Sequence, residues 1–305
     1  GVIYTVFSLV NRIYWNISSL SGIMREIPQQ YADVEKYLTI IEKEPSFKEG
    51  GSSKEKVDGD IVFSNVGFKY QKGESPLFTN LSFTIPKGKI IAIIGESGSG
   101  KSTISKLLLR FYDYNSGSIT IGGTELRNFT IQHLRESIGY VEQHVDLLDD
   151  TIEENILFGV KETQREAKRL LVELIAKKAR IDQLYHRLGE LKLKTLVGER
   201  GVKLSGGERQ RVGIARAIIK DPNILIFDEA TSALDTENEA KVMEAIREVS
   251  QGKTTIIIAH RLSTIKDADT ITILDKGVVV DQGSHSELLK RSEYYKNLLK
   301  HHGNI

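Results

Sequence analysis

A glycine-rich loop between a buried strand and a helix constrains the fold of this chain more than any other feature. Residues 89–95 read KIIAIIG, a continuous apolar run typical of a strand that is buried on both faces. The stretch from Gly95 to Ser102 fits the pattern G-x-x-x-x-G-K-[ST], and KSTISKLLLRFY continues with helical spacing. A chance match somewhere in 305 residues has a probability of roughly 1%. The sequence therefore predicts a phosphate-binding loop in an α/β domain.

The chemistry of such a loop assigns roles to its side chains. Backbone N–H groups cradle phosphate oxygens, helped by the positive end of the following helix. Lys101 would bridge the β- and γ-phosphates of ATP, and the Ser102 hydroxyl would ligate Mg²⁺. We expect the whole loop to bind the nucleotide, and its residues are Gly95, Glu96, Ser97, Gly98, Ser99, Gly100, Lys101, Ser102 and Thr103.

Composition and charge exclude several other classes. The chain is 40% hydrophobic and 27% charged, as an ordinary globular protein is. Its net charge of +1, from 42 basic and 41 acidic residues, provides no basic footprint for nucleic acid. The sequence contains no cysteine, which rules out disulfides and thiolate metal sites. We therefore expect no nucleic-acid partner.

The front of the chain differs from the rest. Residues 1–10, GVIYTVFSLV, are almost wholly apolar, but ten residues are too few to span a bilayer. Helical spacing follows at Tyr31, Val34, Leu38 and Ile41. These residues are either the cytosolic end of a truncated membrane helix or a buried helix of a soluble domain, and the run length favours the first. Because the chain begins with glycine rather than methionine, we expect it to be a fragment.

Three regions follow from this pattern. We assign residues 1–45 to the helix end and a helical linker, and residues 46–60, rich in Gly, Ser and charge, to a flexible linker. The main domain covers residues 61–305 and opens with alternating, antiparallel-type strands at IVFSNVGFKY and LSFTIP. Buried strands return at NILIF, TTIIIA and TITIL. Between them lies a helical insertion at about residues 146–219, where Asp150 with Glu153 reads as a capping box. Helical spacing then continues to about residue 179, at Ala167, Leu170, Leu171, Leu174 and Ile175.

Two further motifs carry chemistry. ILIF places Asp228 and Glu229 at the end of a buried strand, where adjacent carboxylates are costly unless a cation or a reaction needs them. Asp228 would hold Mg²⁺ through water, and Glu229 would act as general base on the attacking water. The alternative is a helix N-cap pair, which is about equally favoured. LSGGERQ places Ser205 and two glycines before a helix, either as a second anion site or as an ordinary turn.

The order of the Lys101 loop, LSGGERQR and ILIFDEATSALD resembles the nucleotide-binding domain of ABC transporters, over about residues 61–301. The resemblance implies that Tyr70 stacks on adenine and that Gln143 touches Mg²⁺ at the contact with the membrane domain. It also implies that Asp235 lies in a loop crossing a dimer interface and that His260 contacts the γ-phosphate. Taken singly, Tyr70 would be read as packing and His260 as structural, and an isolated Gln143 would suggest nothing.

The resemblance also implies a fold and a mechanism. The fold is α/β, a P-loop NTPase (RecA-like) core with an antiparallel β subdomain and an inserted α-helical subdomain, preceded by an N-terminal helical linker. Two copies would form a head-to-tail dimer, homo- or heterodimeric, in which each ATP meets Ser205, Gly206 and Gly207 of the other copy. ATP binding and hydrolysis would then drive a membrane domain of the same chain, which carries the transported substrate.

One loop indicates which type of ABC transporter the chain resembles. TLVGERG, with Glu199, looks like the loop of exporters that senses the membrane domain. We therefore expect an ATP-driven exporter at the cytoplasmic side of the cell membrane. The alternatives are the ATPase of an ABC importer, a soluble ABC ATPase without a transport role, and an inactive regulatory domain. Glu229 and His260 argue against the last.

Overall fold

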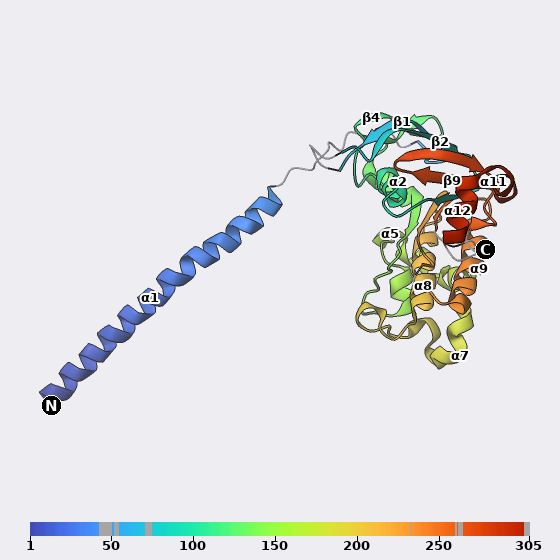
Figure 1. The fold of residues 1–305 in the computed structure, drawn as a ribbon. Helices are drawn as coiled ribbons and strands as arrows, with labels where there is room; N and C mark the ends of the chain where they lie inside the picture. Colours follow the sequence, from blue (N-terminus) through green and yellow to red (C-terminus); the bar gives the residue numbers. More distant parts are fainter. Residues whose placement is uncertain are drawn as a thin grey trace. The chain divides into compact units, whose positions relative to one another are not determined.

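The computed structural model describes residues 1–42, 51, 55–70, 75–232, 234–259, 261 and 265–301. The chain divides into two compact units, residues 1–48 and 49–305 (Figure 1). The described part of the first unit contains one helix of 40 residues, α1 (Val2–Ile41), which includes Pro28 and buries none of its residues. The predicted N-terminal helix is thus confirmed. Judged by length and apolar content together, no helix in the described ranges meets the requirement for crossing a membrane.

A four-stranded antiparallel sheet opens the second unit. Its order is β2-β1-β4-β5. The strands are β1 (Ile61–Phe68), β2 (Phe78–Ile85), β4 (Ser116–Ile121) and β5 (Thr124–Glu125). Its first two strands were expected from the alternation of apolar and polar residues, whereas β4 and β5 were not.

A second, six-stranded sheet has the order β10-β9-β3-β8-β7-β6. Neighbouring strands are parallel except at the edge, where β10 pairs antiparallel with β9. The strands are β3 (Ile90–Ile94), β6 (Ile138–Val141), β7 (Ile224–Asp228), β8 (Thr254–Ile258), β9 (Thr270–Asp275) and β10 (Val278–Gly283). The strand that precedes the glycine-rich loop therefore lies inside the sheet, flanked by β9 and β8, as its continuous apolar run predicted.

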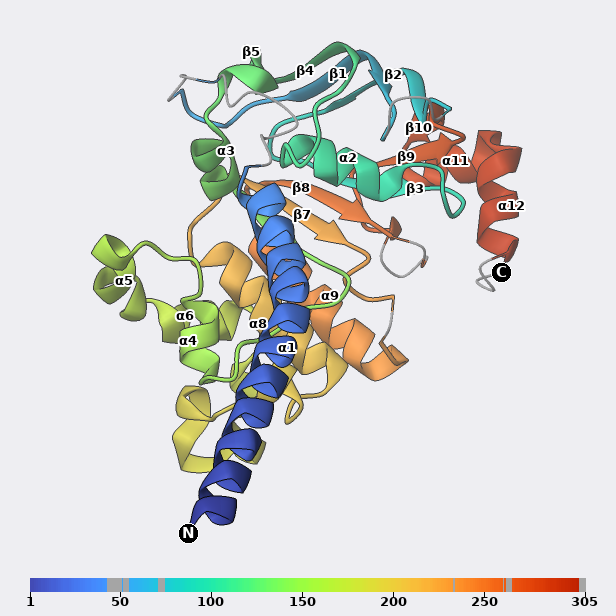
Figure 2. The same cartoon turned by 90° about the vertical axis from the view of Figure 1, so that its left-hand side faces the viewer.

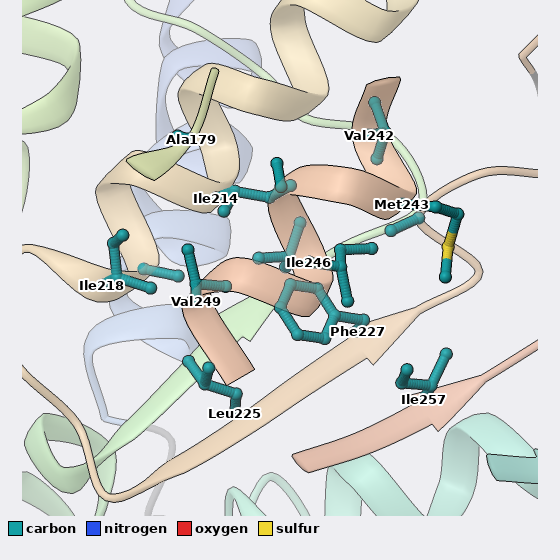
Figure 3. Close-up of a cluster of buried hydrophobic side chains, with 14 of the residues drawn as sticks. Ala179, Ile214, Ile218, Leu225, Phe227, Val242, Met243, Ile246, Val249 and Ile257 are labelled. Carbon is teal, nitrogen blue, oxygen red and sulfur yellow. The ribbon is translucent and has the colours of Figure 1, made fainter. Parts of the chain in front are cut away.

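Alternate residues of these strands enter two different cores. Ile224 and Ile226 of β7 pack with α2 (Lys101–Leu108) and the antiparallel sheet. Leu225 and Phe227 pack on the opposite face, against α8 (Gly206–Ile218) and α9 (Thr236–Ser250). Figure 2 shows α2 beneath the antiparallel sheet, and Figure 3 shows the side chains of α8 and α9 gathered over Leu225 and Phe227. The period of two along the strand thus assigns each face its covering layer.

Short helices fill the region between β6 and β7. They are α4 (Ile152–Ile156), α5 (Glu162–Arg169), α6 (Val172–Lys178) and α7 (Tyr185–Leu188), with 3₁₀ turns at Asp182–Leu184, Gly189–Lys194 and Glu199–Gly201. A further 3₁₀ turn and three helices lie elsewhere: Leu126–Asn128, α3 (Ile131–Ser137), α11 (His285–Arg291) and α12 (Glu293–His301). The inserted helical subdomain is therefore present, and α8 extends it onto the core sheet.

Two local predictions in this region were wrong. The N-cap of α4 is Thr151, whose hydroxyl accepts from the backbone N–H of Glu154, and not Asp150. Asp150 instead accepts from the backbone N–H of Thr151, so its carboxylate is used one residue before the N-cap. The helical run expected to reach residue 179 is also broken, because a turn at Leu170 separates α5 from α6 and leaves that side chain exposed.

Part of the predicted flexible linker packs on the second unit. Val57 has no exposed surface, and its carbonyl accepts from Asn223 Nδ2 at 3.2 Å. Asp60 Oδ1 accepts from the backbone N–H of Lys87 at 2.8 Å. Ordered contacts therefore begin before Ile61. The division into residues 1–45, 46–60 and 61–305 stays a prediction.

Candidate nucleotide-binding site

The glycine-rich loop follows β3 and is shaped by close contacts at two glycines. Gly95 has φ +155°, and a Cβ there would lie 2.0 Å from the carbonyl oxygen of Leu274. Gly100, which precedes α2, has φ +105°, and a Cβ there would lie 2.5 Å from Cε1 of Phe78. Both positions require glycine. A Cβ at Gly98 would meet nothing within 4 Å, so this part of the loop is open to a ligand.

Lys101 lies beneath the loop with little exposed surface. Its Nζ donates to the carbonyl oxygens of Gly95 and Glu96, each at 2.9 Å. Burial lowers the pKa of Lys101, while the charges of Glu229 and Asp228 act in the opposite direction. The ammonium group therefore shares one electrostatic environment with Glu229, the predicted base, and Asp228, the predicted Mg²⁺ ligand, although Glu229 and Lys101 are 128 positions apart in the sequence.

Asp228 is buried at the end of β7 and receives three hydroxyl groups. Ser102 Oγ donates to Oδ1 at 3.0 Å, whereas Ser105 Oγ and the Tyr140 hydroxyl both lie 3.2 Å from Oδ2. Burial and the charge of Asp228 raise the pKa of Tyr140, so its hydroxyl stays a neutral donor. Sequence reasoning missed Ser105 and Tyr140. The spacing of Ser105, one helical turn after Ser102, was a usable signal.

Ser102 and Asp228 offer two oxygen ligands, which suits a Mg²⁺ ion bound together with a nucleotide better than a metal ion held by protein side chains alone. Within the part of the chain that the structure describes, no cluster of three or more His, Cys, Asp or Glu side chains could hold a metal ion. Mg²⁺ prefers hard oxygen ligands and, in nucleotide sites, takes one or two from the protein and the rest from phosphate and water. Ser99 is a second group that suits a bound phosphate, because its buried hydroxyl has no hydrogen-bond partner among the described residues and could donate to a phosphate oxygen.

Glu229 follows Asp228 in a left-handed conformation. Its φ is +51°, and its backbone N–H donates to the carbonyl of Ile258 at 2.9 Å. A non-glycine residue in this region is strained by about 1 kcal/mol or more, and such strain concentrates at functional sites. The kink ends the strand alternation directly after Asp228, so the two carboxylates need not point to opposite faces of the sheet.

Three other residues were predicted to contact the nucleotide or its Mg²⁺: Tyr70, Gln143 and His260. The Tyr70 hydroxyl lies 2.7 Å from Thr103 Oγ1, which joins the predicted adenine-stacking ring to the start of α2. Gln143 Nε2 donates to Ser232 Oγ at 3.0 Å, and none of the hydrogen bonds of the described residues joins its side chain to Ser102 or Asp228. His260 lies outside the described residues.

A second potential anion site lies at the start of α8. Ser205 is its N-cap and forms a capping box with Glu208: Ser205 Oγ accepts from the Glu208 N–H, and Glu208 accepts from the Ser205 N–H. The proton of the Ser205 hydroxyl remains available for an anion outside the helix. Arg187 Nη2 contacts the Glu208 carboxylate at 2.6 Å, which offsets its negative charge beside the helix start.

The start of α9 lies against the start of α8. A Cβ at Gly207 would lie 2.9 Å from Cβ of Asn238, and one at Gly206 would lie 3.2 Å from Leu234. Asn238 in turn donates to Asp235, the N-cap of α9, through its backbone N–H at 2.9 Å. The structure thus brings Ser205, Gly206, Gly207 and Asp235 together. Within the described ranges, no hydrogen bond joins this group to residues 95–103.

A cavity of about 620 Å³ connects the α8 start with the Glu199 loop. Gln143, Glu199 and Gly206 all line it. Arg209 links its walls, because Nη1 donates to the carbonyl oxygens of Leu204 at 2.6 Å and Gly201 at 3.4 Å. The loop with Glu199 is therefore tied directly to the first turn of α8.

A phosphate loop beside the Asp–Glu end of a parallel strand, with a serine–glycine helix start inserted between them in sequence, defines an ABC-type ATPase domain. The chain belongs to the ABC transporter family, which matches residues 78–232. It is the ATP-binding and ATP-hydrolysing domain of that family.

Known relatives resemble the chain over nearly all its length. An ATP-dependent lipid A-core flippase of Vibrio parahaemolyticus is 40% identical over 298 residues, 98% of this chain and 50% of the relative. The flippase of the same name from Escherichia coli is 40% identical over 300 residues, 98% of this chain and 51% of the relative. A solved bacterial Atm1-family ABC exporter with ATP bound is 40% identical, with a TM-score of 0.79 over 96% of this chain and 51% of that one. The chain thus spans about half the length of the relatives it matches.

Proposed function

We propose that this chain is the motor of a membrane exporter and that it works as a head-to-tail pair with a second ATP-binding domain. The observation that carries the proposal is that, among the described residues, no hydrogen bond joins the loop at Lys101 to the α8 start at Ser205, although each has the features of a phosphate site. The loop at Lys101 with Asp228 forms one site, and the α8 start at Ser205 forms the other, preorganised by its capping box. A second copy placed head to tail would complete each nucleotide site from both sides.

Within one site, the side chains divide the work. Bound Mg²⁺ would neutralise phosphate charge. Ser102 and Asp228 are the residues that would hold it, with Gln143 as a further predicted ligand. Lys101 would pair with the phosphates, and Glu229 would orient and deprotonate the attacking water. His260 would contact the γ-phosphate.

The nucleotide base and the partner chain complete the assignment. Tyr70 would stack on adenine, since its half-exposed ring is held at the loop through Thr103. Ser205, Gly206 and Gly207 would bind the partner's nucleotide through the helix start, and Asp235 would lie at the interface between the two copies.

Export follows from what the relatives have in common. The flippases and the Atm1-family exporter carry different names, yet each name describes ATP-dependent movement across a membrane or export. We therefore assign the shared activity, ATP-driven export, and place this domain at the cytoplasmic side of a cell membrane. Its partner there would be a transmembrane domain of the same polypeptide, whose movement Glu199 and Gln143 would sense at their shared cavity.

A single substitution tests the motor. Glu229→Gln keeps the shape of the side chain but removes the base, so ATP hydrolysis should fall by about 10²- to 10⁴-fold while ATP binding persists. With ATP and Mg²⁺, this variant should convert from monomer to a stable dimer, measured by light scattering after size-exclusion chromatography. Hydrolysis near the wild-type rate would remove Glu229 from the role of base. A variant that binds ATP and stays monomeric would remove the head-to-tail pair.

A further inference from the structure

The two oxygens of Asp228 have different surroundings. Oδ1 faces Ser102, the hydroxyl that would share Mg²⁺ with it, at 3.0 Å. Oδ2 faces away from that pair, toward Ser105 Oγ and the Tyr140 hydroxyl. The orientation of this carboxylate therefore depends on which donors hold Oδ2.

Ser105 and Tyr140 differ in how many acceptors compete for their single hydroxyl proton. Ser105 has one hydroxyl proton, and its Oγ lies 2.8 Å from the carbonyl oxygen of Ser102, closer than its 3.2 Å to Asp228. That serine can therefore serve only one of the two acceptors at a time. The Tyr140 hydroxyl donates to Asp228, and its hydrogen bond with Ser105 acts to lower the Tyr140 pKa, which makes Tyr140 the acceptor there and gives the serine a third possible acceptor. Tyr140 is the more dedicated donor to Oδ2.

The sheet places Tyr140 for this role. β6 and β7 are parallel neighbours, and Tyr140 is paired with Ile226. Asp228 lies two residues after Ile226, so all three side chains share the face covered by α2. Both the donor and the acceptor are thus carried by strands, which hold a side chain more firmly than a loop does.

We propose that Tyr140 is a positioning residue for Asp228, and that its hydroxyl holds Oδ2 so that Oδ1 remains aimed at Ser102 and the Mg²⁺ of the nucleotide. This inference rests on the proposed Mg²⁺ role of Asp228. Groups that orient a metal-binding side chain typically account for 10- to 100-fold in metal affinity. Tyr140 should therefore change how strongly Mg²⁺ supports nucleotide binding, without itself contacting the nucleotide.

The test compares binding of AMP-PNP to the chain with excess Mg²⁺ and with EDTA, by isothermal titration calorimetry. Tyr140→Phe keeps the ring and removes only the hydroxyl. We expect it to weaken binding of Mg²⁺–AMP-PNP about tenfold and to change binding of metal-free AMP-PNP by less than about twofold. The ratio of the two affinities is the readout, because a loss of fold or of the loop would weaken both.

Tyr185→Phe is the matched control, since the Tyr185 hydroxyl also donates to a carboxylate, Glu173 Oε2 at 2.7 Å, in the helical subdomain. This variant should keep the wild-type ratio. A wild-type ratio in Tyr140→Phe would overturn the positioning role. A wild-type chain that binds AMP-PNP equally with and without Mg²⁺ would instead overturn the proposed metal site itself, so the two failures are distinguishable.

Discussion

Ser205 and Ser284 allow the structural and functional parts of one side chain to be measured separately. Both are N-caps with capping boxes of nearly the same geometry. The backbone N–H of Glu208 lies 3.3 Å from Ser205 Oγ, and that of Glu287 lies 3.3 Å from Ser284 Oγ. The reverse bonds, from serine N–H to the glutamate, are 2.7 Å and 2.8 Å. Ser205 begins α8 at the proposed interface, and Ser284 begins α11.

Because the two caps have nearly the same geometry, replacing either serine should lower the free energy of unfolding by a similar amount. Replacing an N-cap serine by alanine removes about 1 kcal/mol of stability. For a domain of this size, that corresponds to a fall in Tm of about 2–4 °C. Ser205→Ala and Ser284→Ala should both show it in thermal unfolding followed by circular dichroism.

Only Ser205→Ala should affect pairing. Its hydroxyl would donate to a phosphate, and a hydrogen bond to a charged group contributes about 1.5–3 kcal/mol. A pair of chains contains two such sites, so the loss is about 3–6 kcal/mol, or roughly 10²- to 10⁴-fold in the dimer dissociation constant. The assay is sedimentation velocity with ATP and Mg²⁺ in a Glu229→Gln background. Nucleotide affinity of the monomer should be unchanged.

Two results would refute this reasoning. If Ser205→Ala pairs as tightly as Ser284→Ala, the α8 start does not contact the partner's nucleotide. If Ser205→Ala loses ATP affinity as a monomer, Ser205 acts on the nucleotide of its own chain, and the head-to-tail arrangement fails.

Two further predictions concern the loop and the coupling to the membrane. Burial lowers the pKa of Lys101 in the folded chain below its ordinary value of 10.5. Burying the charged lysine therefore destabilises the fold by its full amount at any pH below the lowered pKa, and this destabilisation disappears above pH 10.5, where the lysine is neutral in both the folded and the unfolded chain. Lys101→Met should therefore abolish ATP binding at pH 7 without lowering Tm, and any gain in Tm should shrink as pH rises toward 10.5; a large fall in Tm at pH 7 would contradict this. Glu199→Ala should leave ATP hydrolysis by this chain within about twofold of wild type. In a full-length transporter reconstituted in proteoliposomes, the same change should lower transport and substrate-stimulated hydrolysis together, and unchanged transport would remove Glu199 from the coupling path.

Much of the site could be predicted because its chemistry is local. The strand run, the glycines and Lys101 are adjacent in sequence, and a strand–loop–helix turn depends mainly on its own residues. The serine–glycine helix start at Ser205 is equally local, since its capping box closes within four residues. Asp228 and Glu229 could be recognised because two adjacent carboxylates after a buried strand are costly without a function.

Strand prediction failed where the local signal was weak. β6 has four residues and β5 only two, too few to display a period. β10 is an edge strand with half-exposed and exposed side chains, so it has no buried run to reveal it. The N-cap of α4 was misplaced by one residue because Asp150 and Thr151 are both good caps, and only the path of the backbone selects between them.

The sequence by itself predicted which residues would carry the chemistry, and it determined how the glycine-rich loop and the helix start at Ser205 fold, because those properties depend on near neighbours along the chain. Only the tertiary structure decided which of them meet. Ser102 and Asp228 are 126 positions apart, and they touch because the sheet order and register bring the end of β7 beside α2. The same register brings Tyr140 of β6 to the second oxygen of Asp228. Strand order and register are long-range choices, set by how two cores pack on opposite faces of one sheet, and no window of sequence contains them.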